Sequence, residues 1–170
     1  MVKPSAFLLI KTKDNSFHLL KKILSKKDVV WANNVYGPYQ IVAYIEAEND
    51  FQLATVIEEM RVENGVEEID ARMVKIIPKD DELDSFKVTK QDSVVLLINV
   101  NYRDEKERVV TWNLRKLAGV KLARAMWGPA DIIAIVEADS HEEMRNLICD
   151  EVKIMNGVIS NTTLYCYPNE

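Results

Sequence analysis

YGPYQIVAYIEAE, at residues 36–48, occurs a second time in this chain as WGPADIIAIVEAD, at residues 127–139. Six of the thirteen aligned positions are identical, and four more keep their character, as Tyr/Trp, Val/Ile, Ile/Val and Glu/Asp. A self-match of this length indicates an internal repeat, which has to be recognised before any fold is assigned. We therefore predict two copies of one small domain rather than a single domain of 170 residues.

Composition and charge narrow the class of protein. The hydrophobic fraction of 48% is ordinary for a globular chain. The formal net charge of −5 argues against direct binding to nucleic acid, because phosphate contacts need a basic face. No apolar run approaches the roughly 20 residues of a membrane helix, and the two cysteines, Cys149 and Cys166, have the irregular placement of reduced thiols. The sequence predicts a cytoplasmic protein with no membrane partner.

The first copy reads as strand, helix, strand, strand, helix, strand. The continuous apolar run 6–10 is typical of a strand buried on both faces, and Phe17, Leu20, Ile23 and Leu24 recur at helical spacing on one side of a helix. The remaining predicted elements are strands at 29–36, 40–46 and 66–77 and a helix that begins after Asn49 or Asp50.

The second copy follows the same plan after a charged linker. Residues 79–93 carry many charges and little apolar pattern, so we place domain boundaries at 1–78 and 94–170. Strands are expected at 94–100, 120–127 and 132–137, with a last strand that ends at Pro168. Helices are expected from about Asp104 and after Ser140, which is a good helix N-cap residue.

This element order predicts an α+β fold. Two right-handed βαβ crossovers within βαββαβ give a ferredoxin-like sheet of strand order 4-1-3-2, with both helices on one face. The opposite face then presents apolar side chains such as Val42 and Ile133, which need a cover. We expect each repeat to cover the other, with the two sheets packed face to face within one chain.

Each repeat resembles the effector-binding RAM domain of the Lrp/AsnC family of feast/famine regulators. The resemblance covers residues 6–78 and 94–168. It rests on the βαββαβ order, the aromatic-Gly turn into an apolar strand, the Glu-Ala-Glu/Asp strand end before a capped helix, and the Asn-Gly-Val entry to the last strand. It implies a dimeric α/β barrel formed by two tandem copies. Because only five residues precede the first predicted strand, we expect the family's helix-turn-helix to be missing.

The same resemblance implies a ligand site near the two turns, where the family binds amino-acid effectors. Carried over, it points to Gly37, Tyr39 and Gln40 in repeat one and to Gly128 and Asp131 in repeat two. Repeat one has Gln40 at the position where the family carries an acidic residue. Repeat two has Ala130 at the position of Tyr39.

The chemistry favours repeat two as the ligand anchor, with a structural alternative for each residue. The Asp131 carboxylate can accept charge-assisted hydrogen bonds from an α-amino group, or it can simply stabilise the turn after Pro129. The hydroxyl of Thr162 can add a polar contact, although threonine is also common in strands. Asp131→Asn is expected to weaken effector binding, and Gln40→Ala to do little.

We find no catalytic or metal-binding pattern. Glu46 and Glu137 occupy matching strand ends, which favours a shared structural task, whereas acid–base chemistry would require the two carboxylates to converge and their pKa values to differ. His18 and His141 lack Cys or carboxylate neighbours at ligand spacing. No Ser-His-Asp set, phosphate-binding glycine loop or zinc pattern occurs. We therefore expect a protein that is not an enzyme and has no catalytic residue, metal or cofactor.

The sequence thus predicts a regulatory protein that binds an amino acid or a related metabolite. We expect it to form homo-oligomers, or hetero-oligomers with related domains, through the edge strands and the turns at Gly37 and Gly128. Two alternatives stay open. One is a monooxygenase-like enzyme built on the same α/β barrel, and the other is a structural assembly partner of Lrp/AsnC-type regulators. The RNA-recognition fold shares the element order but lacks the required aromatic and basic strand positions.

Overall fold

The computed structural model describes residues 2–14, 16–76, 92–101 and 106–167. The chain divides into two compact units. Unit 1 is Met1–Val74 together with Tyr167–Glu170, and unit 2 is Lys75–Cys166. The predicted linker 79–93 lies outside the described residues as far as residue 91. The first strand of unit 2 begins at Asp92, two residues before its predicted start at Val94.

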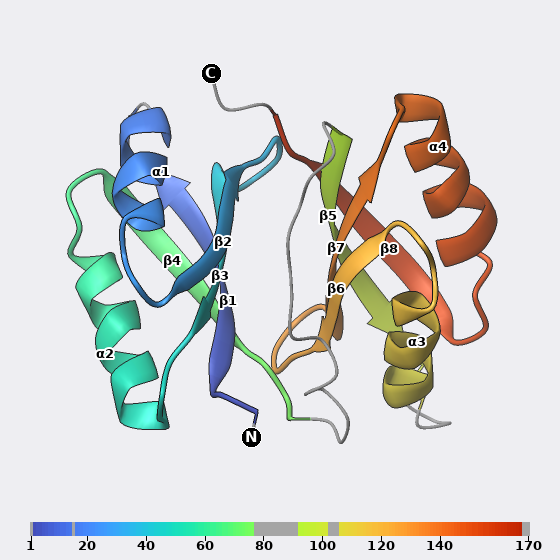
Figure 1. Cartoon of the computed structure of the whole chain (residues 1–170), viewed down its shortest axis with the longest axis horizontal. Helices are drawn as coiled ribbons and strands as arrows, with labels where there is room; N and C mark the ends of the chain where they lie inside the picture. The colour runs from blue at the N-terminus through green and yellow to red at the C-terminus, as the bar shows by residue number, and fades with distance from the viewer. Residues whose placement is uncertain (1, 15, 77–91, 102–105, 168–170) are drawn as a thin grey trace. The chain divides into compact units, whose positions relative to one another are not determined.

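Unit 1 contains a four-stranded antiparallel sheet with both helices on one face (Figure 1). The strand order is β2-β3-β1-β4, which confirms the predicted order 4-1-3-2. Its elements are β1 (Ser5–Thr12), α1 (Ser16–Leu24), β2 (Val29–Asn34), β3 (Ile41–Glu46), α2 (Asp50–Arg61) and β4 (Val66–Met73).

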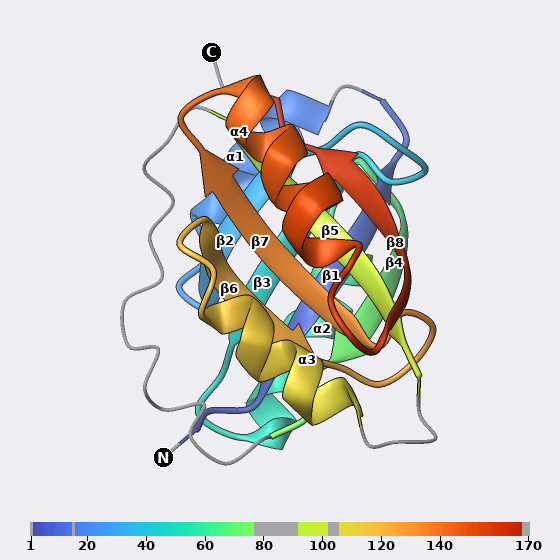
Figure 2. The same ribbon diagram turned by 90° about the vertical axis from the view of Figure 1, so that its right-hand side faces the viewer.

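Unit 2 repeats this arrangement with the strand order β6-β7-β5-β8. Figure 2 shows α3 and α4 lying side by side over one face of its sheet. Its elements are β5 (Asp92–Val100), α3 (Lys106–Arg115), β6 (Val120–Ala125), β7 (Ile132–Ala138), α4 (His141–Asn146), the π-helical segment η3 (Leu147–Val152) and β8 (Val158–Tyr165). The predicted helix start at Asp104 lies outside the described residues.

The strands expected to be central are buried as their composition requires. In β3 only the last residue is partly exposed, and every residue of β7 is buried. The helices cover one face and build a core with it in each unit. The N-cap of α2 is Asn49, whose side chain accepts from Gln52 N (2.8 Å), and Ser140 caps α4 in the same way. Both caps were predicted.

The predicted inner side of the first helix was partly wrong. Leu20 and Ile23 are buried, but Phe17 is 41% exposed and Leu24 is 46% exposed, while Leu19 joins the core instead. The first helix spans nine residues, so its inward stripe is short. A rotation of the buried side by one residue is therefore enough to expose Phe17 and Leu24 and to bury Leu19.

Repeat two contains one more residue than repeat one between its turn and its last strand. Gly37 aligns with Gly128 at an offset of 91, whereas Gly65 aligns with Gly157 at an offset of 92. The extra residue falls in the π-helical segment Leu147–Val152. A π-helical turn closes its hydrogen bonds at i→i+5, so it holds an inserted residue without breaking the helix.

The core positions on both helices show where the insertion was absorbed. In α2 the buried Ile57 and Met60 are three residues apart, whereas in η3 the buried Ile148 and Val152 are four apart. Lys153 N donates to Ile148 O (3.0 Å), which is the i→i+5 bond. The wider turn thus keeps both core positions facing the sheet despite the additional residue.

Candidate functional site

The two glycine–proline turns occupy equivalent places and dock on the central strand of their own sheet. Gly37 (φ 139°) and Gly128 (φ 103°) both adopt positive φ, which glycine tolerates without strain. After each turn the chain returns to the sheet: Gln40 N donates to Ile10 O and Asp131 N donates to Ile98 O, both at 2.9 Å. Each turn that carries predicted site residues is therefore anchored by a backbone hydrogen bond to the central strand.

Gln40 and Asp131 perform the same structural task. The Gln40 Oε1 atom accepts from Thr12 N (2.9 Å), and the Asp131 Oδ2 atom accepts from Val100 N (2.8 Å). Each of these N–H groups lies where the pairing with the last strand shifts its register. A bulge takes such a group out of the ladder, and a side-chain acceptor satisfies it. Asp131 is only 5% exposed, and its role in ligand binding stays a prediction.

Tyr39 meets two charged residues of β4 that sequence reasoning missed. The Tyr39 hydroxyl donates to Asp70 Oδ2 (3.3 Å), and Arg72 Nη2 donates to the same oxygen (2.6 Å). The Lys11 ammonium lies 5.9 Å from the centroid of the Tyr39 ring. We call Tyr39, Asp70, Arg72 and Lys11 the Tyr39 cluster. It presents a phenol, a carboxylate and two cations within unit 1.

Burial and charge both act on the Tyr39 cluster. The Arg72 side chain is 11% exposed and the Asp70 side chain 31% exposed, so this ion pair is largely removed from water. Burial raises the pKa of the Tyr39 phenol, and the neighbouring Asp70 carboxylate raises it further through its charge and its hydrogen bond. The phenol therefore stays protonated at neutral pH and remains a hydrogen-bond donor.

Unit 2 lacks this set of groups. Ala130, Thr162 and Leu164 occupy the positions of Tyr39, Asp70 and Arg72. Thr162 is exposed on β8 opposite Leu97 of β5, and Leu164 is buried. Ala130 has a φ of 62°, the left-handed region that few non-glycine residues adopt. The residues predicted for repeat two, Gly128, Asp131 and Thr162, thus supply one buried carboxylate at the turn and one exposed hydroxyl on β8.

Glu46 and Glu137 each lie beside a pocket, and the two pockets are equivalent in the repeats. The pocket around Glu46 measures about 210 Å³ and the pocket around Glu137 about 400 Å³. Glu46 accepts from the Tyr44 hydroxyl (3.1 Å), whereas Glu137, only 1% exposed, pairs with Lys121 (3.0 Å). Each glutamate holds a nearby side chain.

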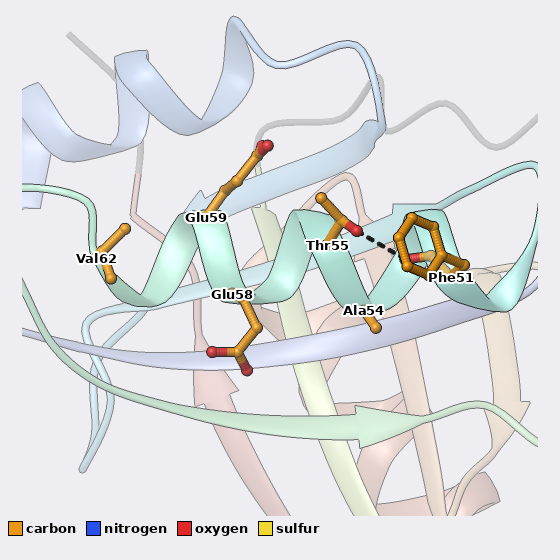
Figure 3. A pocket seen from close by; sticks show the side chains of 6 residues that line it. All are labelled: Phe51, Ala54, Thr55, Glu58, Glu59 and Val62. Carbon is orange, nitrogen blue, oxygen red and sulfur yellow. Dashed lines mark hydrogen bonds between the residues drawn. The ribbon is translucent and has the colours of Figure 1, made fainter.

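A third pocket lies on the outer side of α2 (Figure 3). Its volume is about 450 Å³, and its rim carries Phe51 and Val62, which are 83% and 84% exposed. The one hydroxyl in it, that of Thr55, donates to Phe51 O of its own helix (2.9 Å). The groove offers apolar surface with two glutamates but no converging set of polar groups.

Histidine and cysteine contribute no site in the described part of the chain. His18 and His141 are exposed, and the His141 ring stacks on Tyr165 at 5.9 Å. No group of three or more His, Cys, Asp or Glu residues could hold a metal ion there. Burial raises the pKa of the Cys166 thiol to about 11, which makes it a poor nucleophile. None of the helices in the same residues is long and apolar enough to cross a membrane.

Solved structures of other proteins share the fold of this chain over nearly its whole length. Over 96% of this chain, the structure of the siroheme decarboxylase NirDL matches at a TM-score of 0.68, with 10% identity and 71% of that chain covered. Its co-complex with an iron-uroporphyrin III analogue matches at 0.69. The predicted fold class, a tandem pair of ferredoxin-like domains as in dimeric α/β-barrel proteins, is confirmed.

Two further structures extend the comparison. An anthrone oxidase-like protein matches at a TM-score of 0.59, with 10% identity, over 96% of this chain and 90% of that chain. The crystal structure of FFRP-DM1 matches 44% of this chain and 97% of its own, with 24% identity and a TM-score of 0.42. No family model and no curated protein matches this sequence.

These findings correct one expectation. The prediction that the protein is not an enzyme is contradicted, because the structures similar over the whole chain are a decarboxylase and an oxidase-like protein. At 10% identity the similarity establishes the fold, and it is a fold that enzymes use. The resemblance to Lrp/AsnC regulators is supported at the level of the ferredoxin-like topology of each unit.

Proposed function

We propose that this protein binds a small molecule that carries both a carboxylate and an ammonium group, an amino acid or a related metabolite, at the Tyr39 cluster. The observation that supports this is the Asp70–Arg72 pair beside the Tyr39 phenol. A guanidinium binds a carboxylate through two parallel hydrogen bonds, and a carboxylate accepts from an ammonium group. The cluster therefore offers a complement to each charge of a zwitterion.

The proposed site includes the predicted turn of repeat one, but its ligand-binding carboxylate is Asp70 and not Asp131. Gly37 lets the turn fold back, Gln40 fixes it to β1 through Thr12, and Tyr39 forms a wall next to the ion pair. Asp70 replaces Asp131 as the carboxylate that meets the ammonium group, because Asp131 is buried against Val100 N. Gly128, Asp131 and Thr162 then form the weaker half-site of the second turn.

A second candidate function is an enzyme reaction on a carboxylated substrate, which the similarity to the siroheme decarboxylase NirDL favours. A decarboxylase acts on a carboxylate, the group that Arg72 is suited to hold. The bond to the carboxyl carbon would break with release of CO₂, and its electron pair would stay on the substrate carbon. The protonated Tyr39 phenol would give that carbon a proton and regain one from water. Ligand binding at the cluster is the step that both functions share.

Binding can be tested with a thermal-shift screen of the twenty amino acids and iron-uroporphyrin III, because a ligand of the folded state raises the melting temperature. Calorimetry with the strongest ligand would then compare Asp70→Asn and Arg72→Met with Thr162→Ala, the change at the equivalent place in unit 2. We expect each cluster variant to bind at least about tenfold more weakly, roughly 1.4 kcal/mol, and Thr162→Ala, in the weaker half-site, to have a much smaller effect.

Two results would decide against the proposal. Unchanged affinity in both cluster variants would remove the Tyr39 cluster as the site, and a loss confined to Asp131→Asn would move the site to repeat two. The enzyme candidate needs one more measurement, the mass of siroheme after incubation with the protein. Loss of a carboxyl group with wild type but not with Tyr39→Phe would support it, and an unchanged mass would reject it.

A further inference from the structure

Three of the edge strands of the two sheets, β4, β6 and β8, are protected to different degrees. On β4, Arg61 Nη1 donates to Ile69 O (2.7 Å), and the strand itself carries Glu67, Glu68, Asp70 and Arg72. On β6, Arg115 Nε and Nη2 donate to Ala123 O (3.1 and 2.9 Å). Charges and capping side chains of this kind keep an edge from pairing with another strand.

The β8 edge has neither form of protection. Its sequence, Val158–Tyr165 (VISNTTLY), contains no charged residue, and none of the hydrogen bonds seen among the described residues caps its backbone with a side chain. Half of its residues are β-branched, namely Val158, Ile159, Thr162 and Thr163, which favours extended pairing. Ile159 is 68% exposed and Tyr165 is 43% exposed. The edge is therefore both open and well suited to a further strand.

The direction of the β8 backbone groups follows from one hydrogen bond. Cys166 N donates to Ser93 O (3.0 Å), toward β5. Backbone groups alternate in direction along a strand, so Thr162 also faces β5, and Asn161 and Thr163 face away from the sheet. Among the described strands β8 pairs only with β5, so the N–H groups of Asn161 and Thr163 point to the open side of the sheet. The Asn161 Nδ2 atom is also buried without a hydrogen-bond partner among the described residues.

We propose that the β8 edge pairs antiparallel with the β8 edge of a second copy of this chain. A twofold axis through Thr162 places Asn161 opposite Thr163 of the second copy, and these two residues exchange both backbone hydrogen bonds. Thr162 then lies next to Thr162 of the second copy, a favourable cross-strand pair. The two four-stranded sheets that contain β8 become one continuous sheet.

A second copy fits this edge better than the charged alternatives within the chain. Pairing of two β4 edges about Asp70, the residue equivalent to Thr162, would place its carboxylate next to Asp70 of the other copy, which is unfavourable. An uncharged edge carries no such penalty against itself, and an isologous contact closes at two copies. This proposal is independent of ligand binding at the Tyr39 cluster and narrows the predicted contact region to one edge.

Light scattering on a size-exclusion column at micromolar to hundred-micromolar protein tests the pairing. We expect wild type to have twice the 19.5 kDa chain mass. Thr163→Pro removes one outward N–H and leaves the bonds toward β5 intact, and Thr162→Lys places two like charges on the axis. Both should run as monomers with wild-type circular dichroism. Ala71→Pro makes the matching backbone change on β4 and should stay dimeric.

The outcomes separate cleanly. A wild-type monomer across the concentration range overturns the proposal. So does a dimer that persists in Thr162→Lys, the variant at an exposed side chain that has no reason to unfold. Loss of the dimer in Ala71→Pro with retention in Thr163→Pro would move the interface to β4 and would also overturn it.

Discussion

Each unit includes one residue that lies two positions after the last strand of the other repeat. This docking residue binds at the same place in both units, but through different side-chain chemistry. In unit 1 this docking residue is Tyr167, and in unit 2 it is Lys75. Tyr167 N donates to Asn34 O (3.3 Å), and Lys75 N donates to Ala125 O (2.8 Å). The two acceptors are equivalent in the repeats, so the backbone contact belongs to the fold.

The side chains of the two docking residues make different contacts: Tyr167 makes aromatic contacts, and Lys75 makes an ion pair and a cation–π contact. The Tyr167 ring lies 4.5 Å from the ring of Tyr36 and 5.8 Å from that of Phe17. The Lys75 ammonium lies 4.3 Å from the Trp127 ring and pairs with Glu107 at 2.9 and 3.1 Å. Tyr36 and Trp127 are the aromatic residues of the repeated turn. The turn aromatic thus contacts the docking residue in both units, while the docking residue itself differs.

The second helix of repeat one, α2, is regular, whereas its counterpart in repeat two contains the π-helical segment η3. This difference gives the largest predicted effect. Deletion of Glu58 from α2 would turn Met60 by about 100° away from the core, because the α-helix has 3.6 residues per turn. Burial of Met60 would be lost, and we expect the free energy of unfolding to fall by about 2–5 kcal/mol. Deletion of Asp150 from η3 instead gives Ile148 and Val152 the α-helical spacing of repeat one.

Denaturant unfolding of the two deletion variants measures this contrast. The Asp150 deletion should keep the wild-type free energy within about 1 kcal/mol, since it only removes the residue that the π-helical turn accommodates. Equal losses in both variants would mean that η3 is required for packing and does not merely absorb an insertion.

The docking residues give the next largest effect. Tyr167→Ala should lower the free energy of unfolding by about 1–2 kcal/mol, since aromatic pairs each contribute about 0.5–1.5 kcal/mol. Lys75→Ala should cost about 1 kcal/mol from the ion pair and the cation–π contact. High salt should shrink the loss for Lys75→Ala only, because it screens charges. A salt-dependent loss for Tyr167→Ala would refute the division into two chemistries.

Much of this fold could be predicted from the sequence. The repeat at residues 36–48 and 127–139 predicted two domains, and the element order βαββαβ with right-handed crossovers predicted the strand order 4-1-3-2 that both sheets have. The π-helical turn could not be predicted from periodicity, because a one-residue insertion looks like an imperfect helix. Its signal was the change in repeat offset from 91 at the turns to 92 at Gly65 and Gly157.

The candidate site was predicted only in part. Tyr39 and Gln40 were named from the turn, but Asp70 and Arg72 alternate with apolar residues, as on any solvated strand face. They meet Tyr39 because Gln40 bonds to Ile10 of β1, which directs the turn across β1 toward β4. That path depends on tertiary packing and leaves no local pattern in the sequence.

A smaller effect is expected at the position where Tyr167 docks. Both side-chain polar atoms of Asn34 are buried and have no hydrogen-bond partner among the described residues, and its equivalent in unit 2 is Ala125. Removing an unsatisfied buried amide recovers its desolvation cost, so Asn34→Leu should raise the free energy of unfolding by about 1 kcal/mol. Asn33→Leu is the control, since Asn33 Oδ1 accepts from Asn34 N (2.9 Å) and its loss should destabilise. A destabilised Asn34→Leu would point to a polar ligand or water at this amide.

The smallest predicted effect is a pH dependence that only unit 1 can have, since Ala130 replaces Tyr39 in unit 2. Burial and the Asp70 charge raise the pKa of the Tyr39 phenol above its ordinary value. The folded state then holds this proton more tightly than the unfolded state. The stabilisation is complete below the unfolded pKa of about 10 and is lost as pH rises through the folded pKa. Asp70→Asn removes the charge but not the burial, so the pKa should fall only part of the way. The difference in ultraviolet absorbance between each protein and its Tyr39→Phe derivative isolates this phenol from the other tyrosines. An identical titration with and without Asp70 would contradict this prediction and would show that burial alone raises the pKa of the Tyr39 phenol.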